Sequence, residues 1–237
     1  MPVYIYSITG KQHPLHLDGL SGVGAPSAGL RTVTAGPLCA VVSDAPEDLR
    51  PKRRDVIAHQ EVQKRLMADG TVLPMRFGLL AENDEAVRLA LEQNAEDYSD
   101  RLLALEGCVE YHLKASQDED ALLRQILRES DVARALNDEI RAGTAGPDAS
   151  LRLGELVTQE VQARQEALAA GVVEALRPFA RKLESSQPTG SDFINVSFLV
   201  TVKQEEAFLA SELSVAHQMG DDFDFRLNGR LPPYSFV

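Results

Sequence analysis

Short apolar runs in the first fifty residues predict strands. Residues 3–9 are rich in β-branched and aromatic side chains, which is typical of a buried strand. Residues 19–29 are rich in glycine and predict a loop. Two further apolar runs, 30–35 and 38–43, flank Gly36-Pro37 and predict a hairpin.

The hydrophobic period becomes helical after about residue 51. One predicted helix ends near Gly70, and its apolar face consists of Val56, His59, Val62 and Leu66. Residues 71–77 are predicted to be extended. A second helix is predicted to begin at Asn83 as its cap, with a stripe of Val87, Leu91, Ala95, Tyr98, Leu102 and Leu105. We therefore predict an α+β domain over residues 1–106, in which the two helices cover one side of a small, mainly antiparallel sheet.

The second half of the chain repeats the mixture of strands and helices. Residues 108–115 alternate, which predicts a half-buried strand with Glu110, His112 and Lys114 on its wet side. Ser116 and Glu119 have the spacing of a capping box, which predicts one amphipathic helix from there to about residue 140.

A longer helical run, 151–183, is predicted to bend or split at Gly171 and Pro178. A strand over 194–202, a helix over 203–217 and a last strand from Phe223 complete the pattern. The helix is expected to turn inward Leu209, Leu213 and Ala216. This order predicts a second α+β domain over residues 107–237, and both domains would be ferredoxin-like variants.

Composition and charge narrow the function classes. The 237 residues carry a formal net charge of −12, so nucleic acid and anionic lipid would be repelled over most of the surface. No run of about 18 apolar residues occurs, and the first residues predict a strand rather than a secretion signal. Cys39 and Cys108 lie within apolar runs, as free thiols do, and a cytoplasmic protein is expected.

Few residues offer catalytic or ligand chemistry. His13 and His16 flank Pro14 in a predicted loop, with no Cys or further His nearby in sequence, so surface histidines are favoured over a metal site. The glycines of 19–29 match neither a phosphate loop nor a dinucleotide fingerprint. No nucleophile elbow occurs. We therefore predict no catalytic residues, no metal and no cofactor.

The segment Leu73-Pro74-Met75-Arg76-Phe77-Gly78 is a candidate for partner binding. Because a proline cannot donate to a ladder, Pro74 predicts an edge strand or a bulge. Alternation would place Leu73, Met75 and Phe77 on one face and Arg76 on the other. Two interpretations remain open: a core strand in which Arg76 forms a structural ion pair, or an exposed edge that recruits another chain.

Two further candidates are His59 and the end of the chain. His59 lies on an apolar stripe, which favours a core histidine bonded to a nearby carbonyl, the alternative being an interface contact. The last residues form an unusually apolar tail that includes Pro233, Tyr234 and Phe236. We expect this tail to pack on the second domain; otherwise it is a docking peptide.

Several of these segments, taken together, resemble the gas-vesicle F/L proteins. The segments are Tyr4-Ile5-Tyr6, His59-x-x-Val62, Leu73-Pro74-Met75-Arg76-Phe77-Gly78, Phe198-Leu199-Val200 and Pro232-Pro233-Tyr234-Ser235-Phe236. They occur in the family's order over nearly the whole chain. One departure is Gly229-Arg230-Leu231, where the family often has Gly-Pro-Trp.

The resemblance implies a non-catalytic accessory protein of gas vesicle assembly, located in the cytoplasm and at the vesicle. It would bind the small hydrophobic shell protein and other accessory proteins, as a chaperone-like factor or a minor structural component. An acidic protein suits this role, because a subunit with an apolar face would aggregate unless that face were covered. A ligand-sensing regulatory module with ferredoxin-like domains is the alternative.

Overall fold

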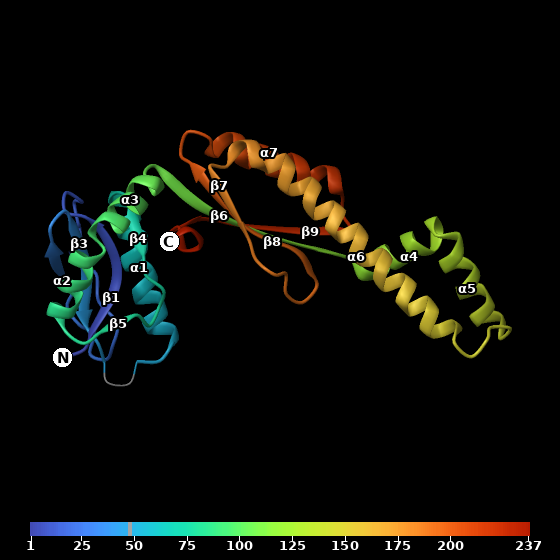
Figure 1. Ribbon diagram of the computed structural model, residues 1–237, viewed down its shortest axis with the longest axis horizontal. Coiled ribbons are helices and arrows are strands. Elements are labelled where there is room, and N and C mark those ends of the chain that lie inside the picture. The colour runs from blue at the N-terminus through green and yellow to red at the C-terminus, as the bar shows by residue number, and fades with distance from the viewer. Residues whose placement is uncertain (47–48) are drawn as a thin grey trace. The chain divides into compact units, whose positions relative to one another are not determined.

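The computed structural model describes residues 1–46 and 49–237 as an α+β protein with two compact units (Figure 1). Unit 1 consists of Met1–Tyr111, Leu199–Val202 and Gly229–Val237. Unit 2 consists of His112–Phe198 and Lys203–Asn228. Segments from three parts of the chain therefore build unit 1.

Unit 1 contains a five-stranded sheet with β1 at its centre. The order is β2-β3-β1-β4, and β5 pairs with β1 as well. All pairs are antiparallel, with Thr9 of β1 opposite Cys39 of β3 and Ile8 opposite Leu73 of β4. The strands are β1 (Val3–Gly10), β2 (Arg31–Ala35), β3 (Leu38–Asp44), β4 (Val72–Pro74) and β5 (Leu80–Ala81).

Helices cover both faces of this sheet, because β1 buries both of its faces. Tyr4 and Tyr6 pack in a cluster with Val62 and Leu66 of α1 (Arg53–Asp69). Val3 and Ile8 pack in a second cluster with residues of α2 (Asp84–Gln93) and α3 (Ala95–Leu105). Figure 1 shows α1 on one side of the strands and α2 and α3 on the other. The prediction that both helices cover one side was wrong.

The predicted helix after Asn83 is two helices. The side chain of Asn83 caps α2, as predicted, by accepting a hydrogen bond from the Ala86 amide at 2.8 Å. Asn94 separates α2 from α3, and its side-chain amide donates to the Ala90 carbonyl at 2.8 Å. An asparagine that bonds to the backbone of its own helix competes with helix propagation, which explains the break.

Unit 2 contains most of a four-stranded sheet of order β7-β8-β6-β9, in which one end of β6, of β8 and of β9 belongs to unit 1. Phe198 of β8 packs on Phe208 of α7 (Glu205–Met219), with ring centroids 5.3 Å apart. Phe208 and Glu205 are the buried residues of α7, whereas Leu209 and Leu213 are exposed, so the predicted inward face of this helix was wrong. The strands are β6 (Cys108–Gln117), β7 (Lys182–Ser185), β8 (Asp192–Thr201) and β9 (Phe223–Leu231).

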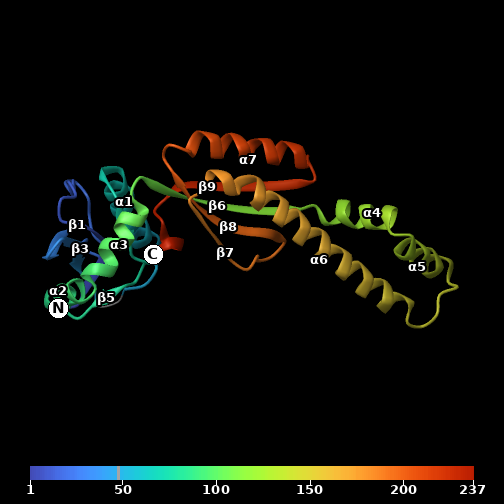
Figure 2. The same ribbon diagram turned by 45° about the horizontal axis from the view of Figure 1, so that its top comes forward.

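Three helices of unit 2 form an arm with a small core of its own. Helices α4 (Glu119–Glu129) and α5 (Asp131–Ala142) pack on the first half of α6 (Ala149–Leu176), and the second half of α6 contacts α7 (Figures 1 and 2). The buried residues of the arm's core are Leu122, Ile126 and Ala133.

The caps of these helices differ from the predicted ones. Ser116 belongs to β6, and the side chain of Asp118 caps α4 by accepting from the Ala121 amide at 2.7 Å. The predicted single helix is broken at Ser130, whose hydroxyl caps α5. A side chain that offers a local acceptor to the next helix's amides ends one helix and starts another.

Helix α6 runs through Gly171 without a break, contrary to the predicted bend, and is followed by the 3-10 turn Arg177–Phe179, which contains Pro178. One glycine inside a helix costs only about 1 kcal/mol. Burial of Val172 and Leu176 next to it offsets that cost.

This geometry predicts that Gly171→Ala stabilises the protein by about 0.5–1 kcal/mol, since a Cβ there would meet nothing within 4 Å. Gly143→Ala is the matched contrast: Gly143 ends α5 with φ +70°, so alanine there should destabilise. Chemical denaturation of both variants tests the pair. Equal changes in the free energy of unfolding would contradict the roles given to Gly171 inside a helix and to Gly143 at a helix end.

Candidate partner-binding site

An aromatic cluster in unit 1 joins three distant parts of the chain. It contains Tyr4 and Tyr6 of β1, His59 of α1 and Phe77 from the turn between β4 and β5. Tyr4 lies 4.7 Å from Tyr6 and 5.7 Å from His59, centroid to centroid. Tyr234, in the 3-10 turn Tyr234–Phe236 of the tail, reaches the same histidine.

Both ring nitrogens of His59 contact tyrosine hydroxyls. Its Nδ1 lies 2.8 Å from the Tyr4 hydroxyl oxygen, and its Nε2 lies 3.2 Å from that of Tyr234. A neutral imidazole can donate at one nitrogen and accept at the other, so both contacts suit the neutral ring. Burial lowers the pKa of His59 to about 4 and raises the pKa of Tyr234 to about 12. His59 is thus neutral at physiological pH, as a core histidine and as the link to the tail.

The turn that follows β4 is held by this cluster. The Gly78 amide donates to the Tyr4 hydroxyl at 3.3 Å, and the Met75 amide donates to the Tyr6 carbonyl at 2.9 Å. The Phe77 ring makes edge contacts with Tyr4 and His59, each at 5.8 Å. The backbone on both sides of Arg76 is therefore tied to buried groups.

The predicted extended segment is shorter than expected, because β4 ends at Pro74 and the chain turns. Leu73 and Met75 pack in the cluster under α2 and α3, whereas Phe77 packs on the α1 side, so these three residues do not share one face. The turn closes with Gly78 at φ +97°, a conformation that favours glycine.

Exposure separates the residues of this segment into two groups. Leu73 and Pro74 are buried, although β4 lies at the end of the sheet order as predicted. Arg76 is exposed and forms no ion pair with the described residues. Next to it, Leu79 and Leu80 are 42% and 47% exposed. The surface at this turn thus consists of one guanidinium and two leucines.

The tail packs on unit 1 and contacts His59 and Leu73's cluster as well as Glu110, so the expectation that it packs on residues 107–237 was right only for Glu110. Pro233 is buried, and Phe236 packs against the cluster that contains Leu73. The Ser235 hydroxyl and amide donate to the two carboxylate oxygens of Glu110 at 2.7 and 2.9 Å. The hydrogen bonds of Ser235 and the packing of Phe236 therefore direct the tail to this surface.

Glu110 is a contact residue that the sequence pattern did not predict. Strand alternation assigned its carboxylate to a wet face, yet it is 4% exposed because the tail covers it. Gly229 shows a similar tertiary constraint: a Cβ there would collide with the buried ring of Tyr111. No local pattern in the sequence signals either contact.

The two loop histidines form polar contacts with the last turn of α1. His13 Nε2 lies 2.9 Å from the Leu66 carbonyl oxygen, and His16 pairs with Asp69 at 3.0 Å. Across residues 1–46 and 49–237, no group of three or more His, Cys, Asp or Glu could hold a metal ion. None of the helices in these residues has the length and hydropathy that spanning a bilayer requires.

Comparison with known proteins places the chain in a family. The family model described as gas vesicle synthesis protein GvpL/GvpF matches residues 2–237, and the chain belongs to this family. Gas vesicle protein F of Streptomyces sp. (strain CB03234) is 41% identical over 238 residues, covering 100% of both chains. Gas vesicle protein L1 of Halobacterium salinarum is 28% identical and covers 92% of this chain and 84% of its own.

Solved structures of the same family share the fold. The crystal structure of GvpF from Anabaena sp. PCC7120 superposes with a TM-score of 0.86 at 23% identity, covering 99% of this chain and 97% of that chain. GvpF from Microcystis aeruginosa gives 0.81 at 24% identity, covering 99% and 98%. Proteins of this family are named for gas vesicles and not for a reaction.

The buried histidine predicts a pH dependence of stability. Below pH 6.5 the unfolded chain protonates His59, whereas the folded protein keeps it neutral down to about pH 4. The unfolded state then binds more protons, so the free energy of unfolding should fall by about 3 kcal/mol as the pH drops through this window.

Because carboxylates also titrate near pH 4–5, His59→Gln is the control. Between pH 6.5 and 5, the variant's free energy of unfolding should depend less steeply on pH, by about one proton. Denaturant titrations across this range measure both slopes. Identical slopes would show that His59 binds the same number of protons in the folded and unfolded states over this pH range.

The tail contacts predict a second stability effect. Deleting residues 232–237 removes two donors to Glu110 and the packing of Phe236, and should lower the free energy of unfolding by about 3–5 kcal/mol. Removing Val237 alone keeps these contacts and should change little. Thermal melts decide: a truncated chain that melts like the full-length one would show that the tail does not stabilise unit 1.

Proposed function

We propose that this protein is a non-catalytic assembly factor of gas vesicles that binds the small hydrophobic shell protein, as a chaperone-like factor or a minor structural component. It would act in the cytoplasm and at the vesicle, together with other accessory proteins. Membership of the family supports the vesicle assignment. The observation that carries the binding role is the exposed turn of Arg76, Leu79 and Leu80 in unit 1.

The chemistry of this turn suits an apolar partner. Arginine is enriched among residues that dominate binding energy, and its planar fork of donors can engage a carboxylate or backbone carbonyls. Leu79 and Leu80 add apolar surface beside it. The Leu80 end of the turn continues into β5, a two-residue strand whose far side could pair with an extended segment.

The buried residues of the site act by positioning this turn. Tyr4 binds the Gly78 amide, and Phe77 packs on Tyr4 and His59. Because a pre-ordered surface loses less conformational entropy on binding, this support would raise affinity. In this proposal Leu73, Pro74, Met75, Phe77 and His59 shape the surface, and Pro233, Tyr234 and Phe236 secure it from the tail.

Coverage of the shell subunit explains why such a factor would be needed. A small protein with an apolar face or open strand edges aggregates unless those surfaces are covered before assembly. A carrier with a charge of −12 stays dispersed while it holds that subunit. Transfer to the growing vesicle would then require only modest affinity, which a small turn provides.

The proposal predicts that Arg76→Ala weakens binding to the shell protein at least about fivefold, equal to about 1 kcal/mol. The melting temperature should stay unchanged, because Arg76 is exposed and has no ion pair with the described residues. Arg152→Ala, at an exposed arginine of α6 in unit 2, is the matched control with the same loss of charge. Co-purification with tagged shell protein, and calorimetric melts, measure both effects.

Leu79→Ser combined with Leu80→Ser tests the apolar half of the turn in the same assay. Binding lost in both turn variants and kept in Arg152→Ala supports the proposal. Wild-type affinity in both turn variants would place the shell-protein contact elsewhere. Failure of the wild-type protein to retain the shell protein at all would remove the proposed function itself.

A further inference from the structure

Helices α2 and α3 form a strongly acidic layer of unit 1. Residues 82–106 contain eight carboxylates and two arginines, a formal charge of −6, which is half of the chain's −12. These helices cover one face of the unit 1 sheet, and their outer side is exposed. The outer side of α2 and α3 is thus a strongly acidic surface of unit 1.

Some of these carboxylates are used within the fold. Arg88 pairs with Glu85 and Glu92, and Arg101 pairs with Asp97 at 3.0 Å. Arg31 of β2 holds Asp84 at 2.8 Å. Among the described residues, the carboxylates of this layer that form no ion pair are Glu82, Glu96, Asp100 and Glu106.

Two of the unpaired carboxylates share one face of α3 with an exposed leucine, and a third directly follows the helix. Glu96, Asp100 and Leu103 are spaced by four and three residues, the spacing that aligns side chains along a helix, and Glu106 is the residue after its last turn. Leu103 is 67% exposed. An apolar side chain therefore lies between carboxylates on either side along the helix.

This arrangement weakens α3 in isolation. Like charges three or four residues apart destabilise a helix by a few tenths of a kcal/mol. The last turn of α3 carries no basic residue, and the carboxylate of Glu106 lies at the negative end of the helix dipole. Both costs would be relieved by positive charges on a partner.

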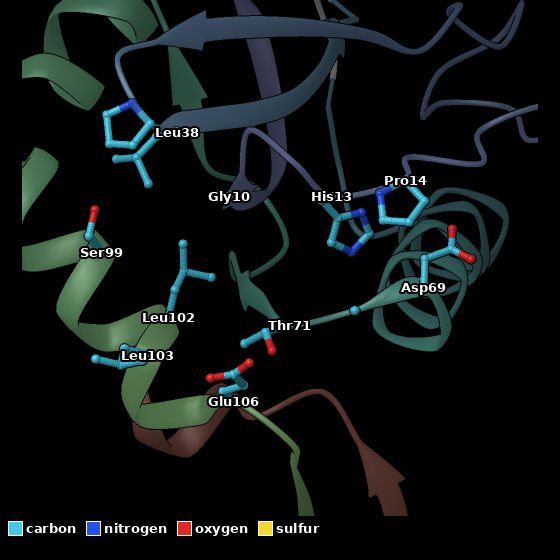
Figure 3. A pocket seen from close by; sticks show the side chains of 12 residues that line it. Gly10, His13, Pro14, Leu38, Asp69, Thr71, Ser99, Leu102, Leu103 and Glu106 are labelled. Atoms are coloured by element: carbon cyan, nitrogen blue, oxygen red, sulfur yellow. The ribbon is translucent and has the colours of Figure 1, made fainter.

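A groove lies beside this face. It has a volume of about 390 Å³, within the range of ligand-binding clefts. Figure 3 shows Leu102 pointing from α3 into the groove below Leu38, with His13 and Pro14 on the opposite side. Leu103 and Glu106 line the groove as well. Apolar contact and negative charge thus meet in one place.

We propose that this groove and the acidic face of α3 bind a basic amphipathic helix of a partner protein. An aliphatic side chain of that helix would contact Leu102 and Leu103. Lysines or arginines one turn before and one turn after it would pair with Asp100 and Glu96 on one side and with Glu106 on the other. The charge complementarity identifies the partner's chemistry, because an apolar groove alone would not select a basic helix.

This surface is distinct from the turn of Arg76, Leu79 and Leu80, since the groove is lined by none of those residues. It offers negative charge, whereas that turn offers a cation. The inference therefore does not depend on the identity of the partner bound at the turn.

The test uses the full-length protein and a designed probe. The probe is a labelled peptide of about 20 residues, since shorter helices are marginal in water. It carries a central leucine flanked by lysines at three and four residues on the same face, with alanines elsewhere. A second peptide of equal composition places the lysines opposite the leucine. Fluorescence anisotropy measures the affinity at about 150 mM salt, because this salt concentration screens attraction between distant charges.

We expect the first peptide to bind at least about tenfold more tightly than the second. Leu103→Ser and the triple variant Glu96→Gln, Asp100→Asn, Glu106→Gln should each weaken binding about tenfold or more. The triple variant should melt at or above the wild-type temperature, because it removes repulsion within α3. The Arg76→Ala variant should bind the first peptide as the wild type does.

A charge-matched variant of unit 2 separates a specific surface from general attraction. Glu155→Gln, Asp221→Asn and Asp222→Asn also remove three exposed carboxylates and should leave the affinity within about twofold. Equal weakening by this variant would overturn the proposal. So would equal binding of the two peptides, an unaltered affinity of Leu103→Ser, or no binding of the first peptide by the wild-type protein.

Discussion

The contact of His59 with two tyrosine hydroxyls is the interaction on which unit 1 depends. One ring nitrogen of His59 contacts the hydroxyl of Tyr4 in β1, and the other contacts the hydroxyl of Tyr234 near the end of the chain. A buried imidazole without partners would cost several kcal/mol, so these hydroxyls and the ring stabilise one another. Since Tyr4 also binds the Gly78 amide, the same contact orders the exposed turn of Arg76.

Burial of polar groups gives this unit a defined arrangement that apolar packing alone would not. The hydroxyl of Tyr6 contacts Ser43 at 3.0 Å and accepts from the Val23 amide at 2.7 Å, which ties the long glycine-rich loop to the sheet. Glu110 likewise accepts two hydrogen bonds from Ser235 and so ties the tail to β6. Hydrogen bonds are directional, so each of these contacts specifies which segment packs where.

The two surfaces proposed for partners differ in their physical basis. The turn of Arg76, Leu79 and Leu80 is rigidly supported from below, and its selectivity would come from shape and from one guanidinium. The outer face of α3 is a regular helix surface. The selectivity of this face would come from the unpaired carboxylates around Leu103. A protein with two such surfaces could hold two unlike proteins at once.

The sequence by itself determined the α+β class, most strands, the positions of α1 and α7 and the Asn83 cap, because hydrophobic period and capping are local properties. Its motifs also indicated the family. It did not determine which face of the unit 1 sheet each helix covers, the inward side of α7 at Phe208, or the breaks at Asn94 and Ser130. Only the tertiary structure decided that the tail packs on unit 1 and that Glu110 is buried. The packing of the tail and the burial of Glu110 depend on contacts between residues more than a hundred positions apart, and no local pattern of side chains encodes such a contact.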